Sequence, residues 1–240
     1  MNSLKEIVNQ IEAEGFQGAH TLIFLIRYAS LAQDRKLSGL IDNTMADMST
    51  LPESPMLLAA YKEWYRATGR GAEIVSFLEA RSENDEDFGM PWDFLELYKE
   101  TFRQEYLEKA ISGAEFILEH FHEMLNPAEV YDIEEPSFNS RVAVLYAELA
   151  RYTQDEKWIN ARNTQNRFIR ILADKYPTKV CYGLIALLGE EFGEQTVVCE
   201  GEIPQALLQF YAPTTAILYR PSEVSRISLM KDGKLEEIML

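Results

Sequence analysis

The sequence predicts a mainly α-helical protein built from helical hairpins, followed by a small C-terminal unit that mixes strands and a helix. Apolar residues recur at spacings of three and four along residues 3–188, as in helices with one buried face. After Gly193 the period changes to short buried runs, QTVVC and TTAILY, which are typical of strands. We therefore expect a helical domain over 1–192 and a small appendage over 193–240 that packs on it.

Glycine and proline mark several ends of the expected helices. Gly15 ends a first helix over 3–13, Gly69 ends the helix MLLAAYKEWYRATG, and a proline-marked joint lies at 51–55. The acidic run SENDEDFG connects two later helices. The expected helices after the first are 19–33, 36–48, 56–69, 72–80, 91–102, 104–121, 141–153, 155–176 and 178–188.

A weak internal repeat runs through the helical part. The repeated unit is a helix with a tyrosine near its end, followed by a short break and a second helix that runs back. This unit recurs around Tyr28, Tyr65, Tyr98 and Tyr152. No single helical hairpin buries its own apolar face, so we expect the hairpins to stack or close on one another. About four hairpins plus single helices approach a full six-hairpin ring.

The C-terminal appendage is expected to contain two structural units. A helix over 204–211 lies between the two predicted strands QTVVC and TTAILY, which together predict a βαβ-like unit. The segments SRISLM and KLEEIML then predict a hairpin with Asp232 and Gly233 in its turn.

Charge and composition exclude several classes of partner. The chain has 39 acidic and 23 basic residues, a formal net charge of −16, so it repels nucleic acid and anionic membrane surfaces. The N-terminal stretch has no signal-peptide pattern, and no apolar run is long enough to span a bilayer. We therefore expect a cytoplasmic protein that binds neither nucleic acid nor membrane.

Neither cysteine nor histidine predicts a metal site, and we expect no cofactor. Cys181 and Cys199 are too far apart for a CxxC motif, and reduced cysteines are the default. His120 and His122 are two residues apart on a helix, so they point to different faces and share a metal ion poorly.

The clearest candidate site is the acidic loop that turns at Pro136 and enters a long amphipathic helix. Pro136 keeps the preceding residue out of the helical region, and Ser137 or Asn139 can cap the helix. One interpretation is a plain helix entrance with a solvated acidic approach. The alternative is a polar site for a small ligand, lined by Tyr131, Asp132, Ser137, Asn139 and Ser140.

The loop and its helix, EVYDIEEPSFNSRVAVL, resemble the "YDGA-PSGNS-A" segment of a family that joins a thioredoxin-like domain to a six-hairpin, glycosidase-like α/α toroid. Bacterial YyaL-type proteins and the animal spermatogenesis-associated relatives belong to that family. Further segments are similar in the same order and cover most of residues 15–220: GFQGAHTLIFLIRYASLAQD, LELYKETFRQEYLEKAISGAEFILEHF and YGLIALLGEEFGEQTVVCEG. The resemblance implies a compact or incomplete α/α toroid of helical hairpins with a small C-terminal α/β appendage.

The resemblance also nominates residues around the expected cavity. His20 lies in the segment that matches a cavity-lining part of the family. Trp92 and Asp93 replace small or apolar positions at a helix entrance, where an aromatic ring beside a carboxylate could stack a sugar. The alternative for Trp92 is packing within a helix interface.

Departures from the family bear on function. The long insertions expected after Met48 and Ala80 are cut to STLPES and SENDEDFG, and the thioredoxin-like domain is not among these residues. Phe138 replaces a glycine of the family motif and fills space that a ligand would use. Because loops usually carry function, this pattern indicates a scaffold without catalysis.

Three functional hypotheses follow. The first is a non-catalytic six-hairpin-glycosidase-like protein that binds a small polar, sugar-like ligand or a protein partner on the face carrying residues 131–140. The second is a carbohydrate-active enzyme, a glycoside hydrolase or sugar epimerase, that uses carboxylates or His20 in the toroid centre. The third is a homo-oligomer in which one copy covers the open cavity of another.

Overall fold

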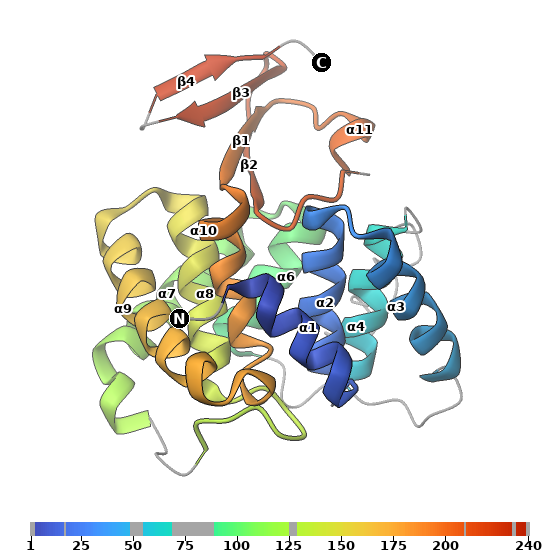
Figure 1. Ribbon diagram of the computed structural model, residues 1–240. Coiled ribbons are helices and arrows are strands. Elements are labelled where there is room, and N and C mark those ends of the chain that lie inside the picture. The colour runs from blue at the N-terminus through green and yellow to red at the C-terminus, as the bar shows by residue number, and fades with distance from the viewer. Residues whose placement is uncertain are drawn as a thin grey trace.

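The computed structural model describes residues 3–16, 18–48, 55–68, 89–124, 129–208, 210–231 and 234–238. These residues form a helical body with a small four-stranded sheet at one end (Figure 1), which confirms a mainly α protein with a C-terminal sheet. The helix expected over 72–80, and most of the acidic connection before Pro91, lie outside the described residues. The division of the chain into two domains at residue 192 stays a prediction.

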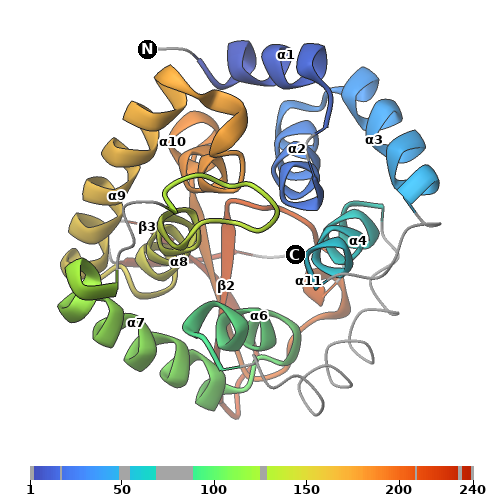
Figure 2. The same ribbon diagram turned by 90° about the horizontal axis from the view of Figure 1, so that it is seen from below.

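The helices fall close to the expected ranges. In chain order they are α1 (Leu4–Glu14), α2 (Ala19–Ala32), α3 (Arg35–Met48), α4 (Pro55–Ala67), α6 (Pro91–Thr101), α7 (Gln104–Met124), α8 (Phe138–Thr153) and α9 (Glu156–Lys175). Seen from below, α2, α4, α6 and α8 lie nearer the centre of the body, whereas α1, α3, α7 and α9 lie around them (Figure 2). Outer and inner helices therefore alternate from α1 to α4 and from α6 to α9, whereas α4 and α6, which flank residues outside the described ranges, are both inner.

The breaks after three of the inner helices begin with the same backbone conformation. Helices α2, α6 and α8 each end at a non-glycine residue in the left-handed conformation, and these residues are Gln33, Phe102 and Gln154. In each case the backbone N–H of that residue donates to a carbonyl one turn earlier. The next helix then begins within one to three residues, which gives the repeated hairpin its short break.

Helices α2 and α8 are the most deeply placed. Eleven residues in a row, 19–29, are buried in α2, and α8 is buried over 142–152. Helix α2 packs in an apolar cluster with α1 and α4, and α8 packs in a second cluster with α6, α7 and α9. A helix that is apolar around most of its circumference belongs in the interior, so α2 and α8 form the centre of the two clusters.

The last expected helix, 178–188, is broken into short pieces. The structure has two 3₁₀ turns, η2 (Pro177–Lys179) and η3 (Gly183–Leu187), followed by the short helix α10 (Leu188–Phe192). The break falls where the backbone N–H of Tyr182 donates to the carboxylate of Asp132, at 2.9 Å, instead of to a helical carbonyl. A tertiary hydrogen bond thus competes with helix formation, which sequence periodicity does not reveal.

The sheet has the strand order β2-β1-β3-β4. Strands β1 (Gln195–Glu200) and β2 (Thr215–Arg220) are parallel, with the short helix α11 (Gln205–Leu208) between them in the chain, which confirms the βαβ-like unit. Strands β3 (Arg226–Lys231) and β4 (Lys234–Glu237) pair antiparallel, as expected for a hairpin, and Asp232 and Gly233, which were expected in its turn, lie outside the described residues. In the part of the chain that the structure describes, no helix is long and apolar enough to cross a membrane.

Candidate functional site

Asp132 is the anchor of the acidic loop and lies buried, with 4% of its surface exposed. One carboxylate oxygen accepts from the backbone N–H of Ser137 at 2.8 Å, and the other accepts from that of Tyr182 at 2.9 Å. Its own backbone N–H donates to the carbonyl of Lys179 at 2.7 Å. The carboxylate therefore ties the loop to both the start of α8 and the segment before η3, a structural role that uses both of its oxygens.

Ser137 and Ser140 build the start of α8. The hydroxyl of Ser137 accepts from the backbone N–H of Ser140 at 3.2 Å and donates to the Ser140 hydroxyl at 3.1 Å. Ser137 is thus the helix cap, one of the two alternatives that the sequence offers. A Cβ added at Gly183 would lie 2.9 Å from the Ser140 hydroxyl, so α8 and η3 approach each other closely at this point.

Two buried side chains near this helix start keep a nitrogen atom without a hydrogen-bond partner among the described residues. They are Nδ1 of His20 and Nδ2 of Asn139, and each residue is 1% exposed. Gln165 donates to Asn139, at 3.2 Å to its carbonyl and 3.3 Å to its side-chain oxygen. Burial lowers the pKa of His20, although the negative charge of Asp132 opposes the shift, so the imidazole is neutral at pH 7.

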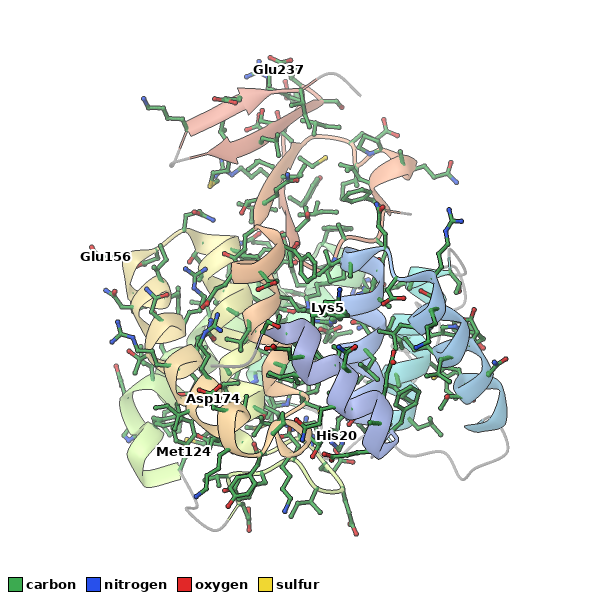
Figure 3. The ribbon with its side chains drawn as sticks, in the orientation of Figure 1. Lys5, His20, Met124, Glu156, Asp174 and Glu237 are labelled. Atoms are coloured by element: carbon green, nitrogen blue, oxygen red, sulfur yellow. The ribbon has the colours of Figure 1, made fainter. Side chains whose placement is uncertain are left out.

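His20 is the second residue of α2 and lies at the lower end of the body (Figure 3). Its ring folds back over Gly18, where an added Cβ would lie 3.2 Å from Cε1. Gly18 has a φ of 113°, a conformation that favours glycine, so this residue provides both the turn and the space for the imidazole.

The remaining predicted site residues lie in packing or capping positions. The Trp92 ring packs edge-on against Phe138, with centroids 6.3 Å apart, and the Arg141 guanidinium lies 5.5 Å above it. Asp93 accepts from the backbone N–H of Met90 at 3.1 Å and so caps α6. The structure agrees with the packing alternative for Trp92.

Tyr131 lies at the start of the same loop and is half-buried. Its ring packs edge-on against Tyr176, with centroids 5.5 Å apart, and Lys179 places its ammonium 5.8 Å and 5.7 Å from the two rings. Ile133, the next apolar residue of the loop, is 73% exposed. The loop thus buries the polar group of Asp132 and exposes Ile133, whereas Tyr131 is half-buried against the apolar cluster that contains α2.

A second polar cluster, which we did not predict from the sequence, lies among the inner helices. Arg27 on α2 pairs with Glu63 on α4 and with Glu148 on α8, the latter at 3.4 Å. Lys99 on α6 pairs with Glu148 and, at 2.6 Å, with Glu96 on its own helix. Lys62, which precedes Glu63 on α4, pairs with Glu96 and so returns the chain of pairs to α4.

We call these six residues the ion-pair circuit: Glu63, Arg27, Glu148, Lys99, Glu96 and Lys62. Acidic and basic residues alternate around it, and it joins all four inner helices. Four of its members are 4–6% exposed, so most of the circuit is removed from water. Buried charges need such partners, because an unpaired ion in a protein interior is very costly.

The partners within the circuit keep the carboxylates of Glu63 and Glu96 ionised at neutral pH, because they lower the pKa of both groups. Burial alone raises the pKa of Glu63, but the charge and hydrogen bond of Arg27 outweigh burial and lower it to about 2. Burial likewise raises the pKa of Glu96, yet Lys62 and Lys99 hold it well below its ordinary value. Burial lowers the pKa of Lys62 to about 8, against the opposing effect of Glu96.

The C-terminal part of the chain reaches the circuit at two points. The hydroxyl of Tyr211, in the segment between α11 and β2, donates to Glu63 at 2.8 Å. Arg151 on α8 lies 3.9 Å from Glu148 and pairs with Glu194 at 3.3 Å, immediately before β1. The sheet end of the body is therefore fastened to the charges at its centre.

A signal for the circuit is present in the sequence, although it is easy to miss. Every member lies within four residues of one of the repeat tyrosines Tyr28, Tyr65, Tyr98 and Tyr152. Arg27 and Glu148 also interrupt the apolar runs LIFLIRYASLA and VAVLYAELARYT, in which a charge needs a buried partner. The tyrosine repeat relates positions on successive helices, and the charged residues in the apolar runs lie near those positions. Together the two observations predict charged side chains at the same height on several helices.

Neither site forms a cluster suited to a metal ion. Over the described ranges, no group of three or more histidine, cysteine or acidic side chains is arranged to hold one. Comparison with known protein families, with curated proteins and with solved structures finds no match for the chain. The resemblance to the toroid family therefore stays a prediction.

Proposed function

We propose that the helical body is a compact α/α toroid, with α2, α4, α6 and α8 as its inner ring. The alternation of inner and outer helices supports this proposal (Figure 2). The ion-pair circuit supports it further, because its pairs run from α4 to α2, α8 and α6 and return to α4. A straight array of hairpins offers no such closed path.

On this scaffold, the protein acts as a non-catalytic binding protein. Glycoside hydrolysis requires one carboxylic acid with a raised pKa opposite a second carboxylate. The circuit instead pairs each carboxylate with at least one cation, and the pKa values of Glu63 and Glu96 are lowered. Carboxylates and cations that are paired in this way hold the helices together, and such carboxylates are poor proton donors.

The binding face is the outer side of the loop over residues 131–140, and its occupant is a protein partner. The observation that carries this proposal is the position of Ile133, which is 73% exposed on a loop fixed by the buried carboxylate of Asp132. A loop that is held rigid loses little conformational entropy on binding. Tyr131 and Tyr176 beside it add aromatic surface of the kind enriched in interfaces.

Substitution of one exposed isoleucine, with a second as control, tests the proposal. Ile133→Asp removes the apolar contact from the loop, whereas Ile171→Asp changes an equally exposed isoleucine on α9, 68% exposed. Proteins captured from an extract of the source cells by the purified chain should be lost with Ile133→Asp and retained with Ile171→Asp. Equal capture by the two variants would contradict a binding role for the loop.

A small polar, sugar-like ligand is the second candidate, and one observation favours it. Nδ1 of His20 and Nδ2 of Asn139 are buried near the loop without partners among the residues described, and a polar ligand could supply acceptors for them. A thermal-shift screen with sugars, sugar phosphates and nucleosides tests this, with Asp132→Ala and Asn139→Ala as comparisons. Turnover of any sugar in the same screen would favour the carbohydrate-active enzyme instead.

A further inference from the structure

The two edges of the sheet differ in how they are covered. At the β2 edge, the backbone N–H of Tyr219 donates to the hydroxyl of Tyr98 on α6 at 2.9 Å, and Ala216 of β2 is buried against the helical body. At the other edge, all four residues of β4 are exposed. The hairpin of β3 and β4 extends away from the helices, with Glu237 at the top of the molecule (Figures 1 and 3).

The pairing of β4 with β3 fixes which of its backbone groups face outward. Ile238 donates its N–H to the carbonyl of Ile227 on β3. Because bonded and non-bonded pairs alternate along an antiparallel ladder, the N–H and C=O groups of Leu235 and Glu237 point to the open edge. An edge with outward backbone groups is a template for another strand.

These groups allow three two-fold antiparallel registers between β4 strands of two copies. In the first register Leu235 of one copy lies opposite Glu237 of the other, which places the two Glu236 side chains opposite each other. In the second register the two Glu237 residues lie opposite each other, so two carboxylates are again opposed. Setting Leu235 opposite itself instead places Lys234 of each copy opposite Glu236 of the other. Only this third register avoids opposed like charges, which destabilise cross-strand pairs.

The same register also matches the two faces of the strand. Lys234 and Glu236 share one face, so the two cross-strand ion pairs lie side by side. Leu235, which is 43% exposed, shares the other face with its β3 neighbour Met230. Two copies would bring both Leu235 side chains together on that face and remove apolar surface from water.

We propose that β4 is a homodimerisation edge, which pairs with β4 of a second copy about a two-fold axis to form a continuous eight-stranded sheet. An isologous contact of this kind uses one self-complementary patch. Four residues per strand form a small interface, so we expect weak association, with a Kd of about 10–100 µM. The proposal is independent of the loop over 131–140, which lies at the opposite end of the body.

Charge exchange at residues 234 and 236 tests the register. Lys234→Glu alone opposes carboxylates and Glu236→Lys alone opposes ammonium groups, so we expect each to weaken dimerisation about tenfold, measured by sedimentation velocity over a concentration series. The double variant should dimerise like the natural chain. An equimolar mixture of the two single variants should form heterodimers, because each then supplies the charge that the other lacks.

Melting temperatures of all variants check that the fold is retained, since these side chains are exposed. A natural chain that stays monomeric at about 1 mM, well above the expected Kd, would overturn the proposal. So would dimers that both single variants leave unchanged, because the contact would then lie elsewhere.

Discussion

The two polar clusters of the helical body are built in opposite ways. At the loop, Asp132 and Ser137 bind mainly backbone N–H groups, and most of the bonds join residues close in sequence. In the ion-pair circuit, side chain binds side chain, and Arg27 and Glu148 are 121 residues apart. The first cluster fixes one loop, whereas the second holds four helices together, so the two should respond very differently to substitution.

The largest effect is expected from removing Arg27. Arg27→Met leaves Glu63 and Glu148 without their shared cation in the protein interior, and breaking such a buried network costs about 3–5 kcal/mol of unfolding free energy. Urea denaturation measures this change. Arg226→Ala is the control, because Arg226 and Glu237 form an exposed pair that contributes under about 1 kcal/mol. Similar losses for the two variants would show that the circuit adds no stability.

Acid should weaken the circuit next. The pKa of Glu63 is lowered from 4.5 to about 2, so the folded state binds fewer protons than the unfolded state between these values. Its stabilising contribution is therefore complete above pH 4.5 and is lost as the pH falls toward 2, by roughly 3 kcal/mol. Denaturation of the natural chain and of Glu63→Gln across this range should give a smaller slope for the variant. If the unfolding free energies of the two proteins fell equally with pH, the acid sensitivity would come from other carboxylates.

The loop should give the smallest and most local effect. Asp132→Ala leaves the N–H groups of Ser137 and Tyr182 without their acceptor, at a cost of about 2–3 kcal/mol. Hydrogen exchange should accelerate at these two amides, while amides in α2 and α4 keep their protection. Glu134→Gln, on the exposed side of the same loop, should change neither. Faster exchange throughout α2 would mean that the loop supports the whole body.

Local rules account for what could be predicted from the sequence. Helix periodicity placed most helices within a few residues, and Pro136 with Ser137 correctly indicated the start of α8. The strands after Gly193 and the hairpin of β3 and β4 were also predicted, because burial in strands follows short local patterns. These features depend on neighbours within one or two turns of the chain.

Tertiary partners account for what was missed. The place of Asp132 in a ligand site stays a prediction, but its structural role was missed: its two acceptor oxygens bind Ser137 and Tyr182, and the second partner is 50 residues away. The same bond breaks the helix expected over 178–188. The repeat tyrosines and the interrupted apolar runs indicate buried charges, but which residues pair in the circuit can be recognised only after four helices are placed at one level.

The long sequence separation within the circuit has a consequence for how the chain is made. During synthesis, Arg27 can meet Glu63 early, but Glu148 follows only after a further 85 residues have emerged from the ribosome, counted from Glu63 to Glu148. Until then Lys99 and Arg27 lack their common acidic partner, and the inner helices cannot be locked around the centre. Pairing of all four inner helices through the circuit is therefore expected late in synthesis, and the apolar faces that they bury against one another stay exposed on the growing chain until then.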